Sequence, residues 1–228
     1  MKKIIFGIFA HPDDEAFGPS GTLLMETQSG SQIHLITLTL GDAGTNPDNH
    51  PDLADVRMRE WQAAGQLMGA ASMNFLGYRD GQLNNQSMIE AGHKIVDLVT
   101  AIVKTADLDT DIEFLSNDLN GISGHIDHAV AARAACWAFY RLQADDQRFK
   151  RIRLSCVPRK MMPHSNNQWL YMEPGRTESE IGQVVDARYL KDEIISIMRC
   201  HHTQRGDGES HIKQRGDQLG LNYFIVLT

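Results

Sequence analysis

Continuous apolar runs alternate along the chain with stretches of helical periodicity. Residues 4–10 (IIFGIFA) form an uninterrupted apolar run, the pattern expected of a strand that is buried on both faces. Residues 33–40 (IHLITLTL) form a β-branched run of the same kind. Further strands are predicted at 73–77, 111–117, 151–157, 168–173 and 222–228.

Apolar positions at helical spacing occupy the intervals between these runs. One stripe extends from Leu53 to Met68, and other helices are predicted at 16–30, 88–106, 126–142 and 189–201. Strands and helices that alternate in this way favour right-handed βαβ crossovers. The predicted fold class is therefore α/β and Rossmann-like, with a largely parallel sheet and helices on both faces. We expect a single domain over residues 1–228, with an antiparallel edge or a substrate-facing insertion around 145–185.

The composition limits the classes of partner that the protein is expected to bind. A hydrophobic content of 42% in 228 residues is enough for a sizeable core, while a formal net charge of −7 without a dense basic run argues against nucleic acid and anionic membranes. The cysteines, Cys136, Cys156 and Cys200, are odd in number and lack CxxC spacing, as expected of reduced thiols in the cytoplasm. Acids interrupt the first apolar run early and no spanning stretch follows, so neither export nor membrane insertion is expected.

The sequence HPDDE, residues 11–15, directly follows the first predicted strand. Ligands of open α/β sheets bind at the carboxyl ends of strands, but these acids would repel a pyrophosphate and the loop lacks the G-x-G-x-x-G pattern of a nucleotide site. A cation fits better, because His11 and Asp14 can aim a nitrogen and an oxygen at one point. In the alternative interpretation, Asp13 or Asp14 caps the next helix and Glu15 complements its dipole.

A second polar motif, GHIDH, lies at another predicted strand end. His125 and His128 are one turn apart at the start of the helix at 126–142, which follows the strand at 111–117. Two histidines and one aspartate form a three-ligand site with an open position, the pattern of catalytic zinc, although such a set also suits Fe²⁺. Asp127 could orient a histidine ring or be an exposed acid of the first turn.

These motifs resemble a known family. AHPDDE, TLGDAG, the R-x-x-E of VRMREWQ, GYRDG, GHIDH and the late HHTQ occur in the order typical of the PIG-L or LmbE-like zinc-dependent de-N-acetylases, from residue 4 to about 204. The combination of HPDDE with a downstream HxDH is the specific part of the match. HIDH replaces the more usual HPDH, and Ser123 stands where some members carry a substrate-contacting tyrosine.

The resemblance implies a role for each motif residue. His11, Asp14 and His128 would bind the metal, Asp13 would be the general base, and His125 would stabilise the oxyanion and protonate the leaving amine. A metal-bound water has a pKa near ~7, so an adjacent free carboxylate can take its proton as attack begins.

Other motif residues have two interpretations each. Arg57 forms an i, i+3 ion pair with Glu60, or, as the resemblance implies, binds substrate. Asp80 is more typical of a turn before Gly81 than of a site wall, and the roles of His201 and Gln204 stay open.

The sequence thus predicts a metal-dependent amide hydrolase with Zn²⁺ or Fe²⁺ as cofactor. The resemblance implies that it removes acetyl from a small conjugate containing N-acetylglucosamine and makes a homo-oligomer plausible. The alternatives are an amidase for a non-sugar or thiol-conjugate substrate and a metal-dependent binding protein without turnover. A nucleotide-binding module is disfavoured by the acidic loop.

Overall fold

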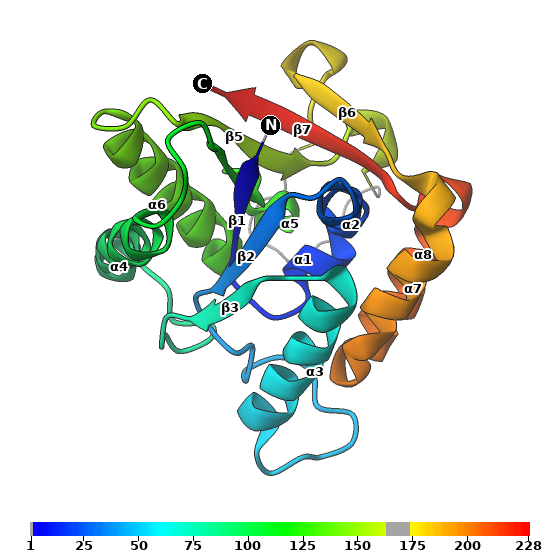
Figure 1. Ribbon diagram of the computed structural model, residues 1–228. Coiled ribbons are helices and arrows are strands. Elements are labelled where there is room, and N and C mark those ends of the chain that lie inside the picture. Colours follow the sequence, from blue (N-terminus) through cyan, green and yellow to red (C-terminus); the bar gives the residue numbers. More distant parts are fainter. Residues whose placement is uncertain (1, 163–173) are drawn as a thin grey trace.

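The computed structural model describes residues 2–162 and 174–228, and its centre is one sheet of seven strands (Figure 1). The strand order is β3-β2-β1-β4-β5-β7-β6. The strands from β1 to β5 are parallel to their neighbours, whereas β7 is antiparallel to both β5 and β6. The strand bounds are β1 Lys3–Phe9, β2 Gln32–Thr37, β3 Ser72–Phe75, β4 Asp111–Asn117, β5 Phe149–Cys156, β6 Gln183–Asp186 and β7 Leu221–Leu227.

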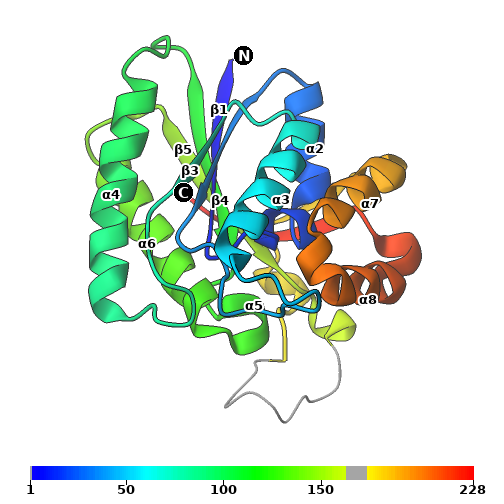
Figure 2. The same ribbon diagram turned by 90° about the horizontal axis from the view of Figure 1, so that it is seen from below.

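Helices cover both faces of the sheet (Figure 2). The apolar cluster on one face joins the sheet to α4 and α6 around Phe114 and Ile95, and the cluster on the other face joins it to α2, α3 and α7 around Leu23 and Trp61. The α/β class with a largely parallel sheet is therefore confirmed. The helix bounds are α1 Asp14–Phe17, α2 Ser20–Gln28, α3 Leu53–Met68, α4 Asn85–Val103, α5 Gly121–Gly124, α6 Ile126–Gln143, α7 Lys191–Cys200 and α8 Arg205–Arg215.

Some elements differ from the prediction. The helix expected at 16–30 is two helices, α1 and α2, because Pro19 lacks a backbone N–H and disfavours a helical residue before it. The short edge strand β6 and the polar helix α8 were not predicted, since neither carries a long apolar pattern. The strand expected at 168–173 lies outside the described residues, and the single domain over 1–228 stays a prediction.

The strand order shows where a ligand-binding site is expected. From β1 the chain moves outward to β2 and β3, and then returns to the other side of β1 to form β4 and β5. The order therefore reverses between β1 and β4, where the ligands of such sheets bind. Residues 11–15 directly follow β1, and residues 118–128 follow β4, so both motifs lie at this point.

Candidate metal centre and active site

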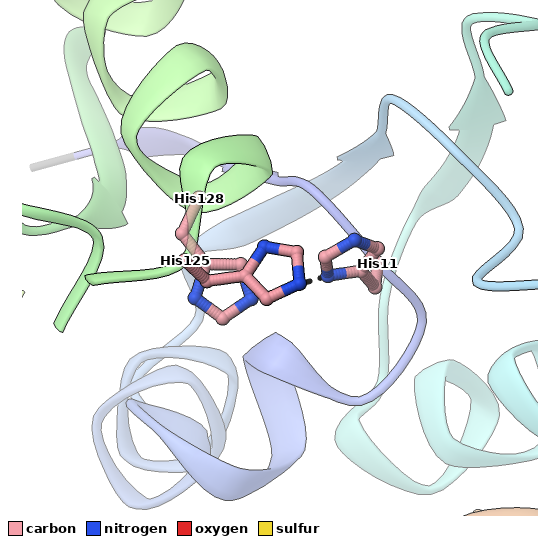
Figure 3. A group of neighbouring side chains, drawn as sticks. All are labelled: His11, His125 and His128. Carbon is pink, nitrogen blue, oxygen red and sulfur yellow. Dashed lines mark hydrogen bonds between the residues drawn. The ribbon is translucent and has the colours of Figure 1, made fainter. Parts of the chain in front are cut away.

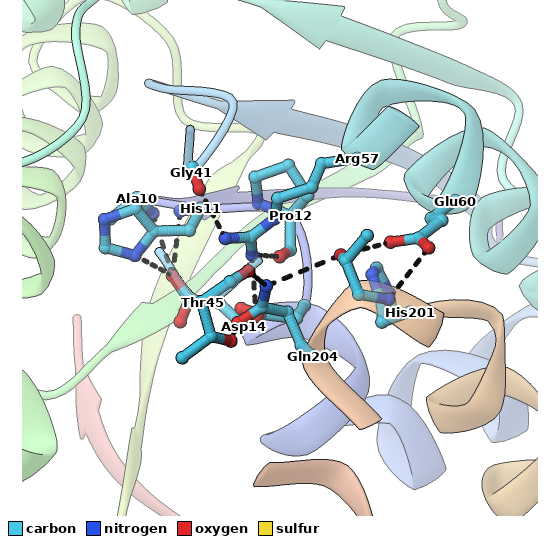
Figure 4. A network of polar contacts seen from close by, with 12 residues as sticks. Ala10, His11, Pro12, Asp14, Gly41, Thr45, Arg57, Glu60, His201 and Gln204 are labelled. Carbon is cyan, nitrogen blue, oxygen red and sulfur yellow. Dashed lines mark hydrogen bonds and ion pairs between the residues drawn. The ribbon is translucent and has the colours of Figure 1, made fainter. Parts of the chain in front are cut away.

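Asp14 folds the loop after β1 back on itself. Its Oδ2 accepts hydrogen bonds from the backbone N–H groups of Ala10 at 3.0 Å and His11 at 3.1 Å (Figure 4). The carboxylate therefore bonds to the end of the strand and does not cap α1. Its other oxygen, Oδ1, lies 3.0 Å from His128 Nε2 across the site.

The rings of His11 and His128 meet although the two residues are far apart in sequence (Figure 3). His11 Nδ1 lies 3.1 Å from His128 Nε2. His128 Nδ1 lies 3.2 Å from the carbonyl oxygen of Gly121, which can only accept, so this nitrogen carries the ring proton. In the neutral ring, the lone pair of His128 Nε2 therefore points into the site.

Two carboxylates flank the opposite edge of the His11 ring. His11 Nε2 lies 2.9 Å from Asp80 Oδ1 and 3.4 Å from Asp127 Oδ2. The backbone N–H groups of Ala43 and Gly81 hold these acids in place by donating to Asp80 and Asp127 respectively, each at 2.8 Å. Carboxylates in this position fix a ring so that its proton is on Nε2 and Nδ1 remains free to bind a metal.

The charges around His11 favour a cation. Burial lowers the pKa of His11, but the carboxylates of Asp127 and Asp80 outweigh it and raise this pKa to about 10. Burial also opposes ionisation of Asp14, yet His128 and His11 hold the pKa of this carboxyl well below its usual range. The centre is therefore a buried, negatively charged position that a positive charge stabilises.

The donor set fits a metal ion. His11 Nδ1, His128 Nε2 and the carboxylate of Asp14 converge from three directions, and carboxylates or a carbonyl fix the far sides of both rings. Two imidazoles and one carboxylate are ligands typical of Zn²⁺ and of non-haem Fe²⁺. His125 also lies within reach of the two other rings, so a set of three histidines is geometrically possible.

Asp13 lies beside this donor set in a strained backbone conformation. Its φ of 118° is in the left-handed region, which is costly for a residue other than glycine. Its Oδ2 lies 2.8 Å from Arg57 Nη2. Burial raises the pKa of Asp13, the charge of Arg57 opposes this rise and the neighbouring Asp14 adds to it, so that the pKa is about 6. A carboxyl whose pKa lies near neutrality is suited to general-base catalysis.

Arg57 holds the loop of Asp13 from α3. Its Nη2 also donates to the carbonyl of Pro12 at 2.5 Å, and its Nη1 donates to the carbonyl of Gly41 at 2.6 Å (Figure 4). The residue is 3% exposed, so most of the guanidinium faces protein atoms. The ion pair with Glu60, one of the two interpretations of Arg57, is replaced by the pair with Asp13, and Glu60 instead accepts hydrogen bonds from Thr203.

His125 precedes α6 and caps it with its own ring. Its Nδ1 accepts the backbone N–H of Asp127 at 3.2 Å, which places the ring proton of neutral His125 on Nε2. The ring stacks on His128 with a centroid separation of 4.8 Å and lies edge-on to His11 at 5.0 Å (Figure 3). Burial lowers the pKa of His125, and the neighbouring histidines lower it further, so the ring is a neutral donor.

The segment after α7 supports this loop from behind. His201 Nε2 lies 3.1 Å from Glu15 Oε1 in a fully buried pair, and Glu15 Oε2 accepts the backbone N–H of Asp13 at 3.3 Å. Gln204 exchanges hydrogen bonds with Thr45, accepting from its hydroxyl and donating to its carbonyl (Figure 4). The late HHTQ motif therefore positions the loops that carry the site.

The site opens into one cavity of about 650 Å³, a size typical of sites for small molecules. The sequence-predicted residues His11, Asp13, Asp14, His125, His128 and Arg57 all line it. Sequence reasoning favoured a turn at Asp80, whereas the structure shows its carboxylate against His11. The signal available was the position of GYRDG after a predicted strand, at the same sheet edge as the two other motifs.

Fold and site together define a Rossmann-like α/β protein. Its His/Asp/His group, which is suited to binding a metal, lies where the strand order reverses between β1 and β4. The family model described as PIG-L, GlcNAc-PI de-N-acetylase, matches residues 6–139. The chain belongs to the PIG-L family.

Similarity to individual proteins extends beyond the matched segment. The chain is 31% identical over 258 residues to a 1D-myo-inositol 2-acetamido-2-deoxy-alpha-D-glucopyranoside deacetylase of Salinispora arenicola, with 96% of this chain and 83% of the relative covered. It is 25% identical to a probable N-acetyl-alpha-D-glucosaminyl L-malate deacetylase 2 of Bacillus subtilis, with 100% and 94% covered. The fold is also that of a 4-carboxy-2-hydroxymuconate hydratase from Pseudomonas putida, with a TM-score of 0.70, 17% identity, and 100% and 97% covered.

Among residues 2–162 and 174–228, no helix is long and apolar enough to cross a bilayer.

The role of Asp80 can be tested by metal binding. Asp80→Asn should weaken the affinity for a probe metal such as Zn²⁺ or Co²⁺ by about 10- to 100-fold, because His11 loses the carboxylate that orients its ring. Competition with a chromogenic chelator measures this change. Asp97→Asn, an exposed change of the same kind on α4, is the matched control, and an unchanged affinity in Asp80→Asn would contradict the role.

Proposed function

We propose that this protein is a metal-dependent amide hydrolase that removes the acetyl group from a small conjugate containing N-acetylglucosamine. The observation that carries the proposal is Asp13, a carboxylate that lies beside the donor set of His11, Asp14 and His128 and that Arg57 holds at 2.8 Å. The relatives from Salinispora arenicola and Bacillus subtilis are both named as deacetylases of N-acetylglucosamine conjugates, which supports this substrate class.

The metal in this proposal is Zn²⁺, with Fe²⁺ as the alternative that the same ligand types allow. His11 Nδ1, His128 Nε2 and the carboxylate of Asp14 would hold it. When bound, such an ion polarises the acetyl carbonyl and lowers the pKa of a water molecule.

The chain's own residues carry the proton and the charge. The ionised carboxylate of Asp13 takes a proton from the water that attacks the acetyl carbon, and Arg57 holds that carboxylate in place. His125 donates its Nε2 hydrogen to the oxygen on which negative charge develops. The proton taken up by Asp13 then passes to the leaving nitrogen as the C–N bond breaks, so that acetate and a free amine are released.

The substrate that the protein hydrolyses, rather than its fold, distinguishes this proposal from its alternatives. The hydratase from Pseudomonas putida shares the fold at 17% identity, so the fold alone does not specify the reaction. An amidase for a non-sugar or thiol-conjugate substrate would use the same groups. A binding protein without turnover would have no need for Asp13 outside the ligand set.

The proposal also includes two predictions about the whole protein, namely that it forms a homo-oligomer and that it is cytoplasmic.

Release of acetate by the purified protein tests the proposed function. We expect acetate and a primary amine in equal amounts from glycosides of N-acetylglucosamine, loss of activity on chelation, and recovery on adding Zn²⁺ or Fe²⁺ under anaerobic conditions. Metal-loaded protein that hydrolyses none of several such glycosides would contradict the substrate class. Activity on non-sugar acetamides alone would favour the first alternative.

A further inference from the structure

The cavity that contains the metal centre continues to a second region formed by α8 and β7. Arg215, at the end of α8, and Tyr223, in β7, line this part of the cavity, and neither belongs to the HPDDE, GHIDH or HHTQ motif. The stacked rings of Phe17, which follows the HPDDE loop, and His211 form another wall of the same cavity. The second region therefore faces whatever part of a bound conjugate extends away from the reacting amide.

Arg215 carries a positive charge that the protein leaves uncompensated. Its Nη2 donates to the carbonyl of Leu221 at 2.5 Å, and its Nη1 lies 3.9 Å from the sulfur of Met161. Within residues 2–162 and 174–228, no carboxylate oxygen lies within 4.0 Å of this guanidinium, and its buried Nε has no hydrogen-bond partner. A guanidinium has five N–H donors, so a single carbonyl satisfies few of them.

The other charged groups of the cavity do not neutralise Arg215. Asp13 pairs with Arg57, while Asp14 and Asp80 face the histidines of the metal centre. Asp207 is exposed in the first turn of α8, eight residues before Arg215 and therefore roughly 12 Å away along the helix axis. A partly buried cation without a carboxylate partner is costly, and an anionic ligand would remove that cost.

The position of Arg215 relative to the metal centre is fixed by packing. The ring of His211, one turn before Arg215, stacks on Phe17 with a centroid separation of 6.3 Å and an interplanar angle of 18°. Phe17 is the last residue of α1, the short helix that begins with the donor Asp14. Burial lowers the pKa of His211 to about 4, so this wall is neutral and Arg215 supplies the charge.

We propose that Arg215 forms a subsite for an anionic group, a carboxylate or a phosphate, on the aglycone of the conjugate whose acetyl group is removed. Arginine suits this role because its planar fork binds both groups through charge-assisted hydrogen bonds. The inference deepens the proposed function and rests on it, since it names the substrate class of the same cavity.

A set of matched glycosides tests the subsite. The N-acetylglucosamine α-glycosides of glycerol, of malate and of glycerol phosphate carry a neutral aglycone, a carboxylated one and a phosphorylated one. The parent protein should prefer one or both anionic glycosides to the neutral one, and which of them it prefers identifies the anion. Arg215→Met should lower kcat/KM for the preferred anionic glycoside by about 10- to 100-fold, mainly through KM. Its kcat/KM for the glycerol glycoside should change far less, because that aglycone has no charge to pair.

Two further variants separate charge from structure. Lys213→Met removes an exposed cation two residues away on α8 and should leave all three values unchanged. Arg215→Lys keeps the charge and should restore part of the preference. An equal loss on neutral and anionic glycosides in Arg215→Met, or no loss on either, would overturn the subsite.

The proposed function can fail without leaving the subsite undecided. If the parent protein hydrolyses none of the three glycosides, calorimetric binding of the malate and glycerol glycosides to the metal-loaded parent and to Arg215→Met still decides the inference. Tighter binding of the malate glycoside that disappears in Arg215→Met would support the subsite. Equal affinities for the two glycosides in the parent would overturn it.

Discussion

Asp13→Asn should lower kcat by about 10²- to 10⁴-fold, the usual contribution of a general base, while the protein keeps its metal. The carboxylate of Asp13 pairs with Arg57 and lies outside the donor set, so its loss removes the proton acceptor and no ligand. Asparagine is chosen because it tolerates the left-handed backbone, with φ at 118°, better than alanine does. Turnover and metal content, measured on the same preparation, check the prediction.

The pH profile adds a second readout for Asp13. A base must be deprotonated to act, so kcat/KM of the parent protein should fall as the pH drops through about 6, the raised pKa of this carboxyl. The residual activity of Asp13→Asn should lack this acidic limb. Asp97→Asn, an exposed substitution on α4, should behave as the parent does. Loss of metal from Asp13→Asn would instead place Asp13 among the ligands.

The sheet and the ligand positions follow from local sequence patterns. The apolar run at 4–10 and the β-branched run at 33–40 have strand character without any tertiary information, and HPDDE and GHIDH directly follow predicted strands. Because the carboxyl ends of parallel strands share one edge of a sheet, these positions were enough to predict that the two motifs would meet, whereas the choice of His128 beside His11 and Asp14 came from the resemblance.

The supporting contacts could not be predicted in this way. Glu15 and His201 are 186 residues apart, and neither local propensity nor periodicity indicates that they form a buried pair. Helix α8 has a polar sequence with two glycines and no apolar stripe, so only its packing on Phe17 reveals that it lines the cavity. Such contacts depend on how the chain connects distant elements, which a single sequence does not encode as a pattern.

The contacts of Arg57 in the structure suggest a role that its sequence motif did not indicate. The resemblance implied a substrate contact, and this role stays a prediction. The structure adds a buried ion pair with Asp13 and hydrogen bonds to the carbonyls of Pro12 and Gly41. A guanidinium with these partners holds the side chain of Asp13 and the backbone before it at once, and would thereby position Asp13 for its proposed role as the base.

Arg57→Met should therefore destabilise the fold as well as lower activity. Removing one partner of a buried ion pair leaves the other charge unpaired, which costs about 3–5 kcal/mol of the free energy of unfolding, or roughly 10 °C in Tm for a chain of this size. We expect kcat to fall together with stability, since Asp13 loses the group that orients it. Thermal and urea unfolding measure the first effect, and initial rates at saturating substrate measure the second.

The double variant Asp13→Asn/Arg57→Met distinguishes positioning from substrate contact. If the two side chains act as a pair, the double variant should be less destabilised than the sum of the single variants by about 1–3 kcal/mol, because no charge is left unpaired. Arg59→Met, an exposed change on the same helix, should leave both stability and kcat unaltered. A large rise in the KM of Arg57→Met, without a change in its free energy of unfolding, would show instead that Arg57 contacts the substrate. Additive destabilisation would show that its hydrogen bonds to Pro12 and Gly41, rather than its pairing with Asp13, carry its contribution.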